Sequence, residues 1–295
     1  MRFSIVIPTY NRPAHLRRCL EAITRLRYPR SEFEVVVVDD GSEPPAAEVF
    51  APFEGNLTLR SIRLHQGGPA RARNAALAEA LGEYIVFTDD DCLPDPGWLE
   101  AFDAVFVARP DAGAGGHIVD APENNIFGRS SQLLVRYLYE YGESSTALPR
   151  FFCGNNLAFP RLGLAALQGF SEGYPLAAGE DRDLCYRWSQ QRDLLFAPSA
   201  IIAHHQDLNF AGFLRQHVRY GRGAFHFWEQ RKMRGEPGRS VAPLDFYTGM
   251  LLFPLRELRA PESVGAAMLI ALSLAANAAG YFAEKRRKIA AGPSS

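Results

Sequence analysis

Three consecutive acids, Asp89-Asp90-Asp91, follow directly after a short apolar run. A second acidic pair, Asp39-Asp40, ends a β-branched run earlier in the chain. Neighbouring carboxylates repel one another unless a cation lies among them. We therefore expect a divalent cation at the Asp89–Asp91 cluster, with ion pairing to basic side chains as the alternative.

Two later segments carry groups that could act with these acids. His204-His205 ends a strand-like run, and one imidazole of such a pair is a candidate metal ligand. Glu180-Asp181 opens a helical pattern. A carboxylate there is ionised at neutral pH and can accept a proton, although acids at a helix start also simply complement the helix dipole.

The elements that must position these residues alternate between strands and helices. Strands are predicted over 3–7, 33–38, 57–64, 84–87, 114–119, 151–159 and 194–203, and helices over 13–26, 69–81 and from 179. Parallel strands need crossovers of a dozen or more residues, which these helices supply. We therefore expect an α/β fold with a doubly wound, mostly parallel, Rossmann-like sheet. Ligands of such sheets bind at the carboxyl ends of the strands, where the acids lie.

Composition narrows the class of protein. The chain has 295 residues, 47% apolar and 22% charged, which is typical of a globular protein, and its net charge of −1 argues against a nucleic-acid partner. The four cysteines are far apart in the sequence and predict neither a zinc site nor disulfides. This pattern favours a location in the reducing cytosol. The chain has neither GxGxxG after the first strand nor GxxxxGK[ST]. These motifs mark dehydrogenases and P-loop proteins respectively, so the sequence argues against both classes.

The C-terminal part is basic and apolar. Residues 211–295 carry 13 Lys and Arg against 6 Asp and Glu, and 211–234 has the pattern of a basic amphipathic helix. Val264 to Ala283 is long enough to span a bilayer and is followed by the basic run 285–288. Because that run prefers the cytosolic side, we expect association with the inner membrane face rather than a single crossing. The association could be at the surface, re-entrant, or made by two apolar segments that enter and return; a helix buried against the protein or a dimer partner is the alternative.

Six strings occur in a characteristic order: SIVIPTYNR, VVVVDDGS, GGPARARNAAL, YIVFTDDDCLP, GEDRDL and PSAIIAHH. Over residues 1 to about 210 the chain resembles the family 2 glycosyltransferases of the GT-A fold. The resemblance implies transfer of a sugar, with inversion, from a nucleotide diphosphate sugar to an acceptor hydroxyl. It further implies a catalytic domain over 1–210, whose nucleotide-sugar half ends near 115 and whose acceptor half spans 116–210, and a helical region over 211–295.

The resemblance also implies roles for individual residues. The nucleotide sugar would contact Pro8, Thr9, Tyr10, Arg12, Asp40, Arg73, Asp89 and Asp90. Asp91, Asp89 and His204 would hold Mn²⁺ or Mg²⁺, with His205 as a rival to His204, and Asp181 beside Glu180 would be the catalytic base. Asp40 matches an acid that often holds uracil, which favours a UDP-sugar, and the acceptor would be a glycan or a lipid-linked glycan of the cell surface.

Two other functions remain open on the sequence. A sugar nucleotidyltransferase shares a related sheet but calls for a Gly-rich signature with Lys or Arg after the first strand, and PTYNRP does not match that signature. A catalytically silent nucleotide-sugar binder, or a scaffold of a membrane polysaccharide-assembly complex, would not need the acidic triplet, the Glu180-Asp181 pair and the late histidine together. The sequence also leaves an oligomer open.

Overall fold

The computed structural model describes residues 1–122, 125–144, 149–174, 178–236 and 241–291. The chain divides into two compact units, which are described separately below. The first, called the sheet unit, comprises Met1–Ala121, Phe151–Glu172 and Leu184–His205. The second, called the helical unit, comprises Pro122–Arg150, Gly173–Asp183 and Gln206–Ser295.

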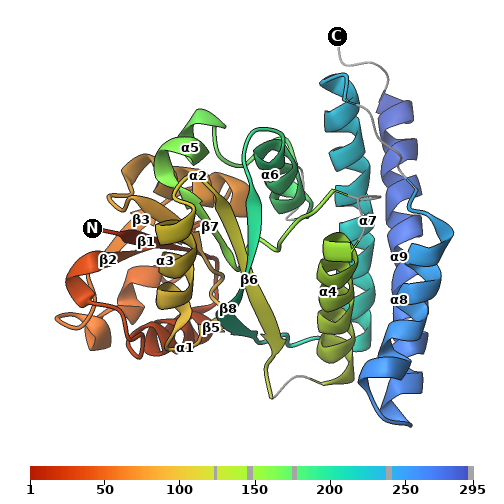
Figure 1. The fold of residues 1–295 in the computed structure, drawn as a ribbon, viewed down its shortest axis with the longest axis horizontal. Helices are drawn as coiled ribbons and strands as arrows, with labels where there is room; N and C mark the ends of the chain where they lie inside the picture. The colour runs from red at the N-terminus through yellow and green to blue at the C-terminus, as the bar shows by residue number, and fades with distance from the viewer. Residues whose placement is uncertain (123–124, 145–148, 175–177, 237–240, 292–295) are drawn as a thin grey trace. The chain divides into compact units, whose positions relative to one another are not determined.

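The described part of the sheet unit contains one mixed eight-stranded sheet (Figure 1), in the order β3-β2-β1-β4-β7-β6-β8-β5. The strands are β1 (Phe3–Thr9), β2 (Phe33–Asp39), β3 (Leu59–Arg63), β4 (Tyr84–Phe87), β5 (Cys92–Pro94), β6 (Gly113–Asp120), β7 (Leu157–Pro160) and β8 (Leu194–His204). The first four strands pair in parallel, as does β6 with β8. β7 runs antiparallel to β4 and β6, and β5 runs antiparallel to β8.

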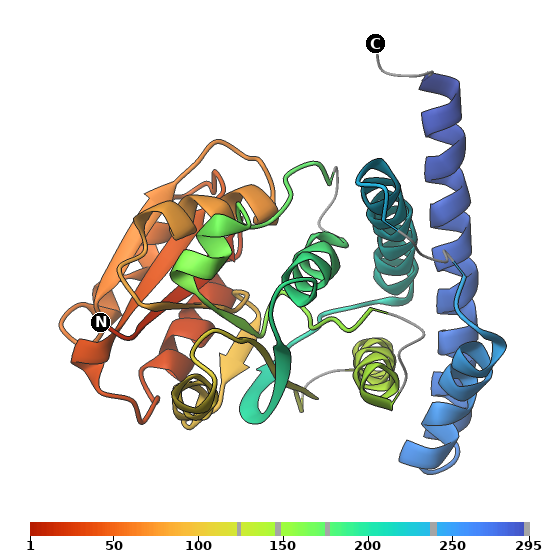
Figure 2. The ribbon, with the colours of Figure 1, turned by 45° about the horizontal axis from the view of Figure 1, so that its top comes forward.

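Helices cover both faces of this sheet, which is why β1 and β2 are apolar along almost their whole length. Helices α1 (Pro13–Ile23) and α3 (Trp98–Ala108) lie on one face and α2 (Pro69–Glu79) lies on the other (Figure 2). Every residue of β2 is buried, including Glu34, which accepts a hydrogen bond from the Ser4 hydroxyl. A strand covered on both sides reads as a continuous apolar run rather than an alternating one.

The second half of the sheet departs from the sequence prediction. A strand was expected over 151–159, but only Leu157–Pro160 pairs, because Cys153 to Asn156 form a turn in which the Asn156 N–H donates to the Cys153 carbonyl. The short strand β5, the helix α3 and the helices α4 (Ile126–Ser144) and α5 (Arg161–Ala166) were not predicted. A three-residue strand that ends in proline has no periodicity to detect.

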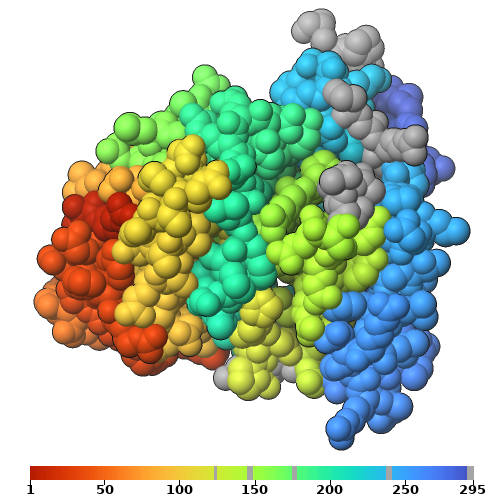
Figure 3. Space-filling view, in the orientation of Figure 1, coloured from red at the N-terminus to blue at the C-terminus, as the bar shows by residue number. Residues whose placement is uncertain are grey.

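The helical unit is built mainly from α4, α7 (Phe210–Met233), α8 (Leu244–Glu257) and α9 (Glu262–Ala291). Its core includes Tyr137, Phe246 and Phe253, and the Tyr137 hydroxyl donates to the Phe246 carbonyl. On the face shown in Figure 3, α8 forms a continuous part of the surface of this unit.

Two glycines allow α7 and α9 to touch backbone to backbone. A Cβ on Gly221 would overlap the carbonyl of Asn277, and one on Gly280 would overlap the carbonyl of Val218. Among the described helices, α9 alone is long and apolar enough to cross a membrane, a test that core helices of soluble proteins also pass.

Candidate active site

The loops after β1 and β2 are tied to each other by side chains. The backbone N–H of Asn11 donates to the Ser42 hydroxyl, and the Asn11 side-chain oxygen accepts from the backbone N–H of Glu43. Asn11 has φ of 53°, a left-handed conformation that asparagine tolerates better than most residues. Tyr10, in the same loop, remains 42% exposed, so its ring is available to a ligand.

Asp40 shapes the start of α2. Its two carboxylate oxygens accept the backbone N–H groups of Gly67 and Gly68, each at 2.8 Å. Gly68 is the residue before α2 and has φ of 87°, which a side chain would strain. The adjacent Asp39 accepts from Ser42 and Ala46 in the same way. These acids therefore hold the loops at the carboxyl ends of the strands, a role that the sequence did not suggest.

The acidic triplet after β4 is matched by basic side chains. Asp89 accepts a hydrogen bond from Arg73 at 2.7 Å. Asp91 lies 2.8 Å from the Arg12 guanidinium, which also reaches Asp90 at 3.3 Å. Ion pairing, the alternative raised from the sequence, thus accounts for part of the charge compensation at this cluster.

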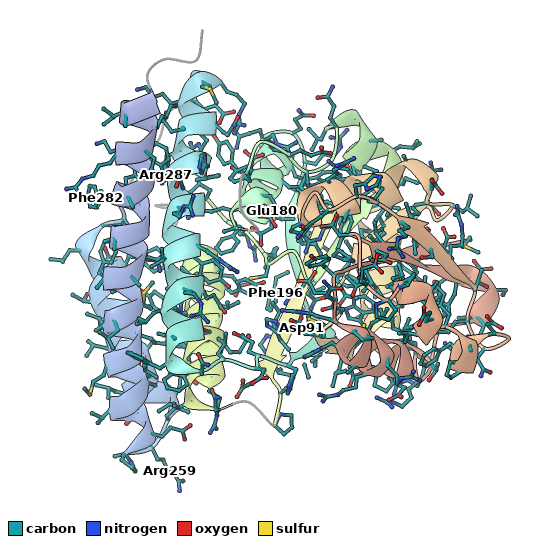
Figure 4. All side chains as sticks on the ribbon, turned by 180° about the vertical axis from the view of Figure 1, so that it is seen from behind. Asp91, Glu180, Phe196, Arg259, Phe282 and Arg287 are labelled. Carbon is teal, nitrogen blue, oxygen red and sulfur yellow. The ribbon has the colours of Figure 1, made fainter. Side chains whose placement is uncertain are left out.

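Asp90 points into the protein and Asp91 toward a histidine. The Asp90 carboxylate accepts from the buried Thr9 hydroxyl at 2.7 Å, which joins β1 to the end of β4. The His204 Nε2 lies 3.4 Å from Asp91 Oδ1. Asp91 is labelled in Figure 4. Residues of β1, of the segment after β4 and of β8 therefore meet at one cluster.

Burial and neighbouring charges shift the pKa values of Asp90 and Asp91 in opposite directions. Burial, reinforced by the negative charge of Asp91, raises the pKa of Asp90 to about 7. Burial by itself would raise the pKa of Asp91, but the hydrogen bond and charge of His204 and the charge of Arg12 lower it well below the usual range. Conversely, burial opposes protonation of His204, yet Asp91 raises its pKa. Asp91 is therefore the carboxylate that stays ionised.

The register of β5 and β8 brings the candidate metal ligands together. Cys92 pairs directly with His204, and single ligand atoms of Asp91, Cys92 and His204 all lie within 4.8 Å of one another. Burial raises the pKa of the Cys92 thiol far above its usual value, so it is protonated and a poor ligand. The donors suited to a hard divalent cation are the Asp91 carboxylate and the His204 imidazole.

The structure distinguishes the two histidines at the end of β8. The ring of His204 faces Asp91, whereas the His205 ring packs near that of His15, with 5.8 Å between centroids. The His205 backbone N–H nevertheless donates to the Asp91 carbonyl at 2.9 Å. His204 is the geometrically suited ligand, and His205 helps to hold the Asp91 backbone.

Arg73 and Asn74 separate into different roles. Arg73 is buried, pairs with Asp89 and lies 5.3 Å above the Phe170 ring. The side chain of Asn74 instead bonds to the backbone N–H and carbonyl of Phe170 and to Glu172. Arg73 therefore belongs to the acidic cluster, while Asn74 fixes a neighbouring loop.

The turn before β7 contains a polar group that the sequence marked only as part of a ligand-facing loop. Asn156 is held by the Trp98 indole and by the carbonyls of His117 and Ala200. The side-chain oxygen of Asn155 is buried and has no hydrogen-bond partner among the described residues. An unsatisfied buried acceptor is costly, and a bound ligand hydroxyl would satisfy it.

Glu180 and Asp181 lie in the helical unit, at the start of α6 (Glu180–Ser189). Glu180, labelled in Figure 4, is buried, and Asp181 is half-buried. Asp181 Oδ1 accepts the N–H of Arg182 at 2.7 Å, a local contact at the first turn of the helix. The predicted base is thus held on a helix N-terminus rather than on a free loop.

The acidic groups of this mixed α/β sheet lie at the carboxyl ends of its strands, where ligands of open α/β sheets bind. Residues 4–162 match the family model of "Glycosyl transferase family 2", and residues 84–283 match that of "Glycosyl transferase family group 2". The chain belongs to glycosyl transferase family 2, a family of enzymes with the GT-A fold.

Similar proteins agree with this assignment. The poly(ribitol-phosphate) β-N-acetylglucosaminyltransferase TarS of Staphylococcus aureus is 38% identical over 93 residues, 31% of this chain and 16% of TarS. Glycosyltransferase AglE of Haloferax volcanii is 38% identical over 100 residues, a third of each chain. The aligned parts therefore span a third or less of these relatives.

A solved structure matches almost the whole chain. The mannosyltransferase PcManGT of Pyrobaculum calidifontis, in complex with GDP-Man and Mn²⁺, is 25% identical, with a TM-score of 0.61 that covers 99% of this chain and 81% of PcManGT. The similarity therefore extends over both the sheet unit and the helical unit of this chain.

Proposed function

We propose that this chain is an inverting, metal-dependent glycosyltransferase that moves a sugar from a nucleotide diphosphate sugar to a hydroxyl of a glycan or glycolipid. The observation that carries the proposal is the meeting of Asp91 and His204 at the edge of the sheet, 3.4 Å apart. Two groups that could bind one cation beside a diphosphate are placed together by strand pairing rather than by sequence proximity.

The sheet unit supplies the proposed donor site. Tyr10 offers an exposed ring for a base, Asp40 organises the loop before α2, and Arg12 and Arg73 bring positive charge to the acidic triplet. We favour a UDP-sugar, because Asp40 matches an acid that often holds uracil and because TarS has been solved with UDP. PcManGT was solved with GDP-Man, so the base needs a direct test.

The donor set fits a divalent cation. Asp91 is ionised, His204 presents a ring nitrogen on the same side, and Asp89 adds a carboxylate next to Arg73. We assign the cation to Asp91 and His204, with Asp89 as the further oxygen ligand, and favour Mn²⁺ or Mg²⁺. When bound, such a cation neutralises the charge that develops on the leaving diphosphate.

The proposed base is Asp181. Its carboxylate would accept the proton of the acceptor hydroxyl while the acceptor oxygen bonds to the anomeric carbon and the bond to the diphosphate breaks. The pair of electrons from the broken bond leaves with the diphosphate, so that no covalent sugar–enzyme intermediate is needed. Glu180 precedes this base and is buried at the same helix start.

Association with a membrane surface is part of the proposal. Exposed α9 residues form one uncharged stripe along the helix: Val264, Met268, Ala271, Leu272, Ala275, Ala278, Ala279, Phe282 and Ala283. Phe282 projects from α9 away from α7 (Figure 4), and the basic run 285–288 follows. We propose a cytoplasmic enzyme that works at the inner face of the membrane on a lipid-linked acceptor in cell-surface polysaccharide synthesis, with residues 1–210 as its catalytic domain.

The decisive experiment combines ligand-induced thermal stabilisation with turnover. UDP, dTDP, GDP and CDP are tested, each with and without Mn²⁺. A ligand at about 100 times its Kd adds roughly 2.7 kcal/mol, enough to raise Tm by several degrees. We expect one nucleotide to stabilise the protein only with Mn²⁺, and Asp181→Asn to keep this stabilisation while losing sugar transfer.

Two outcomes would overturn the assignment. Near-normal transfer by Asp181→Asn would remove Asp181 as the base. Nucleotide binding without transfer to any lipid extract would instead favour a silent nucleotide-sugar binder.

A further inference from the structure

The segment that carries the proposed base is held at both ends by helix α7. Ala178 and Gly179 precede Glu180-Asp181, and Arg182 and Asp183 follow it. All of these residues and α7 belong to the helical unit, so their contacts can be described together.

Upstream of the base, two glycines allow direct backbone contact. A Cβ on Gly223 of α7 would overlap the carbonyl of Ala178. A Cβ on Gly179 would lie 3.0 Å from the carbonyl oxygen of Gly223, and Gly179 has φ of 94°, which strains any other residue. The segment thus rests on α7 at a place where neither chain has room for a side chain.

Downstream of the base, side chains make the attachment. The Arg182 guanidinium lies 4.8 Å above the ring of Phe227, one turn along α7 from Gly223. Asp183 is fully buried and accepts a hydrogen bond at 3.0 Å from Arg234, which caps the end of α7. The backbone N–H of Asp183 donates to the Gly179 carbonyl and closes the first turn of α6.

We propose that Gly223, Phe227 and Arg234 of α7 are positioning residues for Asp181, and this inference rests on the role of Asp181 proposed above. Gly223 and Phe227 lie four residues apart, and Phe227 and the C-cap Arg234 lie seven apart, about one and two helical turns. They therefore line one face of α7, whereas Gly221 faces α9. Helix α7 therefore fixes the position of the Asp181 carboxylate. A displacement of about 1 Å in a reacting group can cost on the order of a hundredfold in rate.

The chain offers a matched pair of substitutions for the test. Gly223→Ala and Gly221→Ala put the same methyl group on the same helix, and each collides with a backbone carbonyl, of Ala178 and of Asn277 respectively. We expect Gly223→Ala to lower kcat at least about tenfold with the KM for the donor unchanged, because only the base is displaced. Gly221→Ala should lower Tm and leave kcat within about twofold.

A second pair keeps the inference testable if Gly223→Ala does not fold. Arg234 pairs with Asp183, and Arg222 of α7 pairs with Glu284 of α9 at 2.6 Å. Arg234→Met should lower kcat and shift the acidic limb of its pH profile, and Arg234→Lys should partly restore both. Arg222→Met should affect only stability.

The outcomes separate this inference from the proposed function. If Asp181→Asn abolishes transfer but the Gly223 and Arg234 variants turn over normally, α7 does not position the base. The same conclusion follows if kcat falls in proportion to Tm for both members of each pair. If Asp181→Asn itself is active, the proposed base fails and this inference fails with it.

Discussion

The imidazole of His204 faces the carboxylate of Asp91 because Cys92, the residue after Asp91, pairs with His204 between β5 and β8. A three-residue antiparallel strand thus brings His204, from late in the chain, to the acids that follow β4. Each group adjusts the acidity of the other: the pKa of Asp91 falls and that of His204 rises. The two groups therefore stabilise each other's charged forms.

Replacing Asp91 should remove metal-dependent nucleotide binding. Asp91→Asn removes the ionised carboxylate next to His204. In a thermal shift assay we therefore expect the nucleotide to raise Tm by the same amount with and without Mn²⁺. Asp95→Asn is the control, because Asp95 is an exposed acid whose side chain accepts the nearby Gly97 N–H. Equal Mn²⁺-dependent shifts in both variants would place the cation elsewhere.

Replacing Asp40 should primarily lower the free energy of unfolding rather than nucleotide binding. Asp40→Asn turns one of two acceptors toward Gly67 and Gly68 into an NH₂ group, which cannot accept their N–H groups. We expect a loss of about 1–3 kcal/mol in the free energy of unfolding, measured by urea titration. The exposed acid Asp111 provides the control Asp111→Asn. A stable Asp40→Asn protein that no longer binds nucleotide would mean that Asp40 contacts the base directly.

His217 should make the helical unit sensitive to acid. Burial lowers its pKa to about 4, and the groups that face it are neutral: the Ser131 hydroxyl, the Asn277 amide and the rings of Phe213 and Tyr220. The unfolded chain therefore binds a proton more readily, so stability is complete above about pH 6.5 and declines as the pH falls toward 4.

Urea unfolding of wild type at pH 7.5 and pH 5 measures this effect. We expect His217 to contribute a loss on the order of 2 kcal/mol at pH 5. His217→Gln should flatten the dependence, while His65→Gln, at an exposed histidine, should not. An unchanged pH dependence in His217→Gln would show that another group is responsible.

The uncharged stripe of α9 should bind anionic vesicles. Phe282 is 57% exposed at the end of the stripe that precedes the basic run, so Phe282→Ser should weaken co-sedimentation with phosphatidylglycerol vesicles several-fold. Leu162→Ser, at an exposed leucine of α5, is the matched control. If the wild type does not sediment with the vesicles and remains in solution without detergent, the membrane proposal is wrong.

The sequence by itself determined the parallel half of the sheet and the family. β1, β2 and β4 are local, mostly apolar runs, and the acids at the ends of β2 and β4 are read directly from the chain. Such signals need no knowledge of distant contacts, because periodicity and strand-end motifs depend on neighbouring residues only.

Tertiary structure decided the rest. It placed the ring of His204 against Asp91, gave Asp40 the backbone N–H groups of Gly67 and Gly68, and paired the acidic triplet with Arg12 and Arg73. It also brought Gly223 against Ala178. Each of these contacts joins residues far apart in sequence, and their partners are set by strand register and helix packing, which local patterns do not encode.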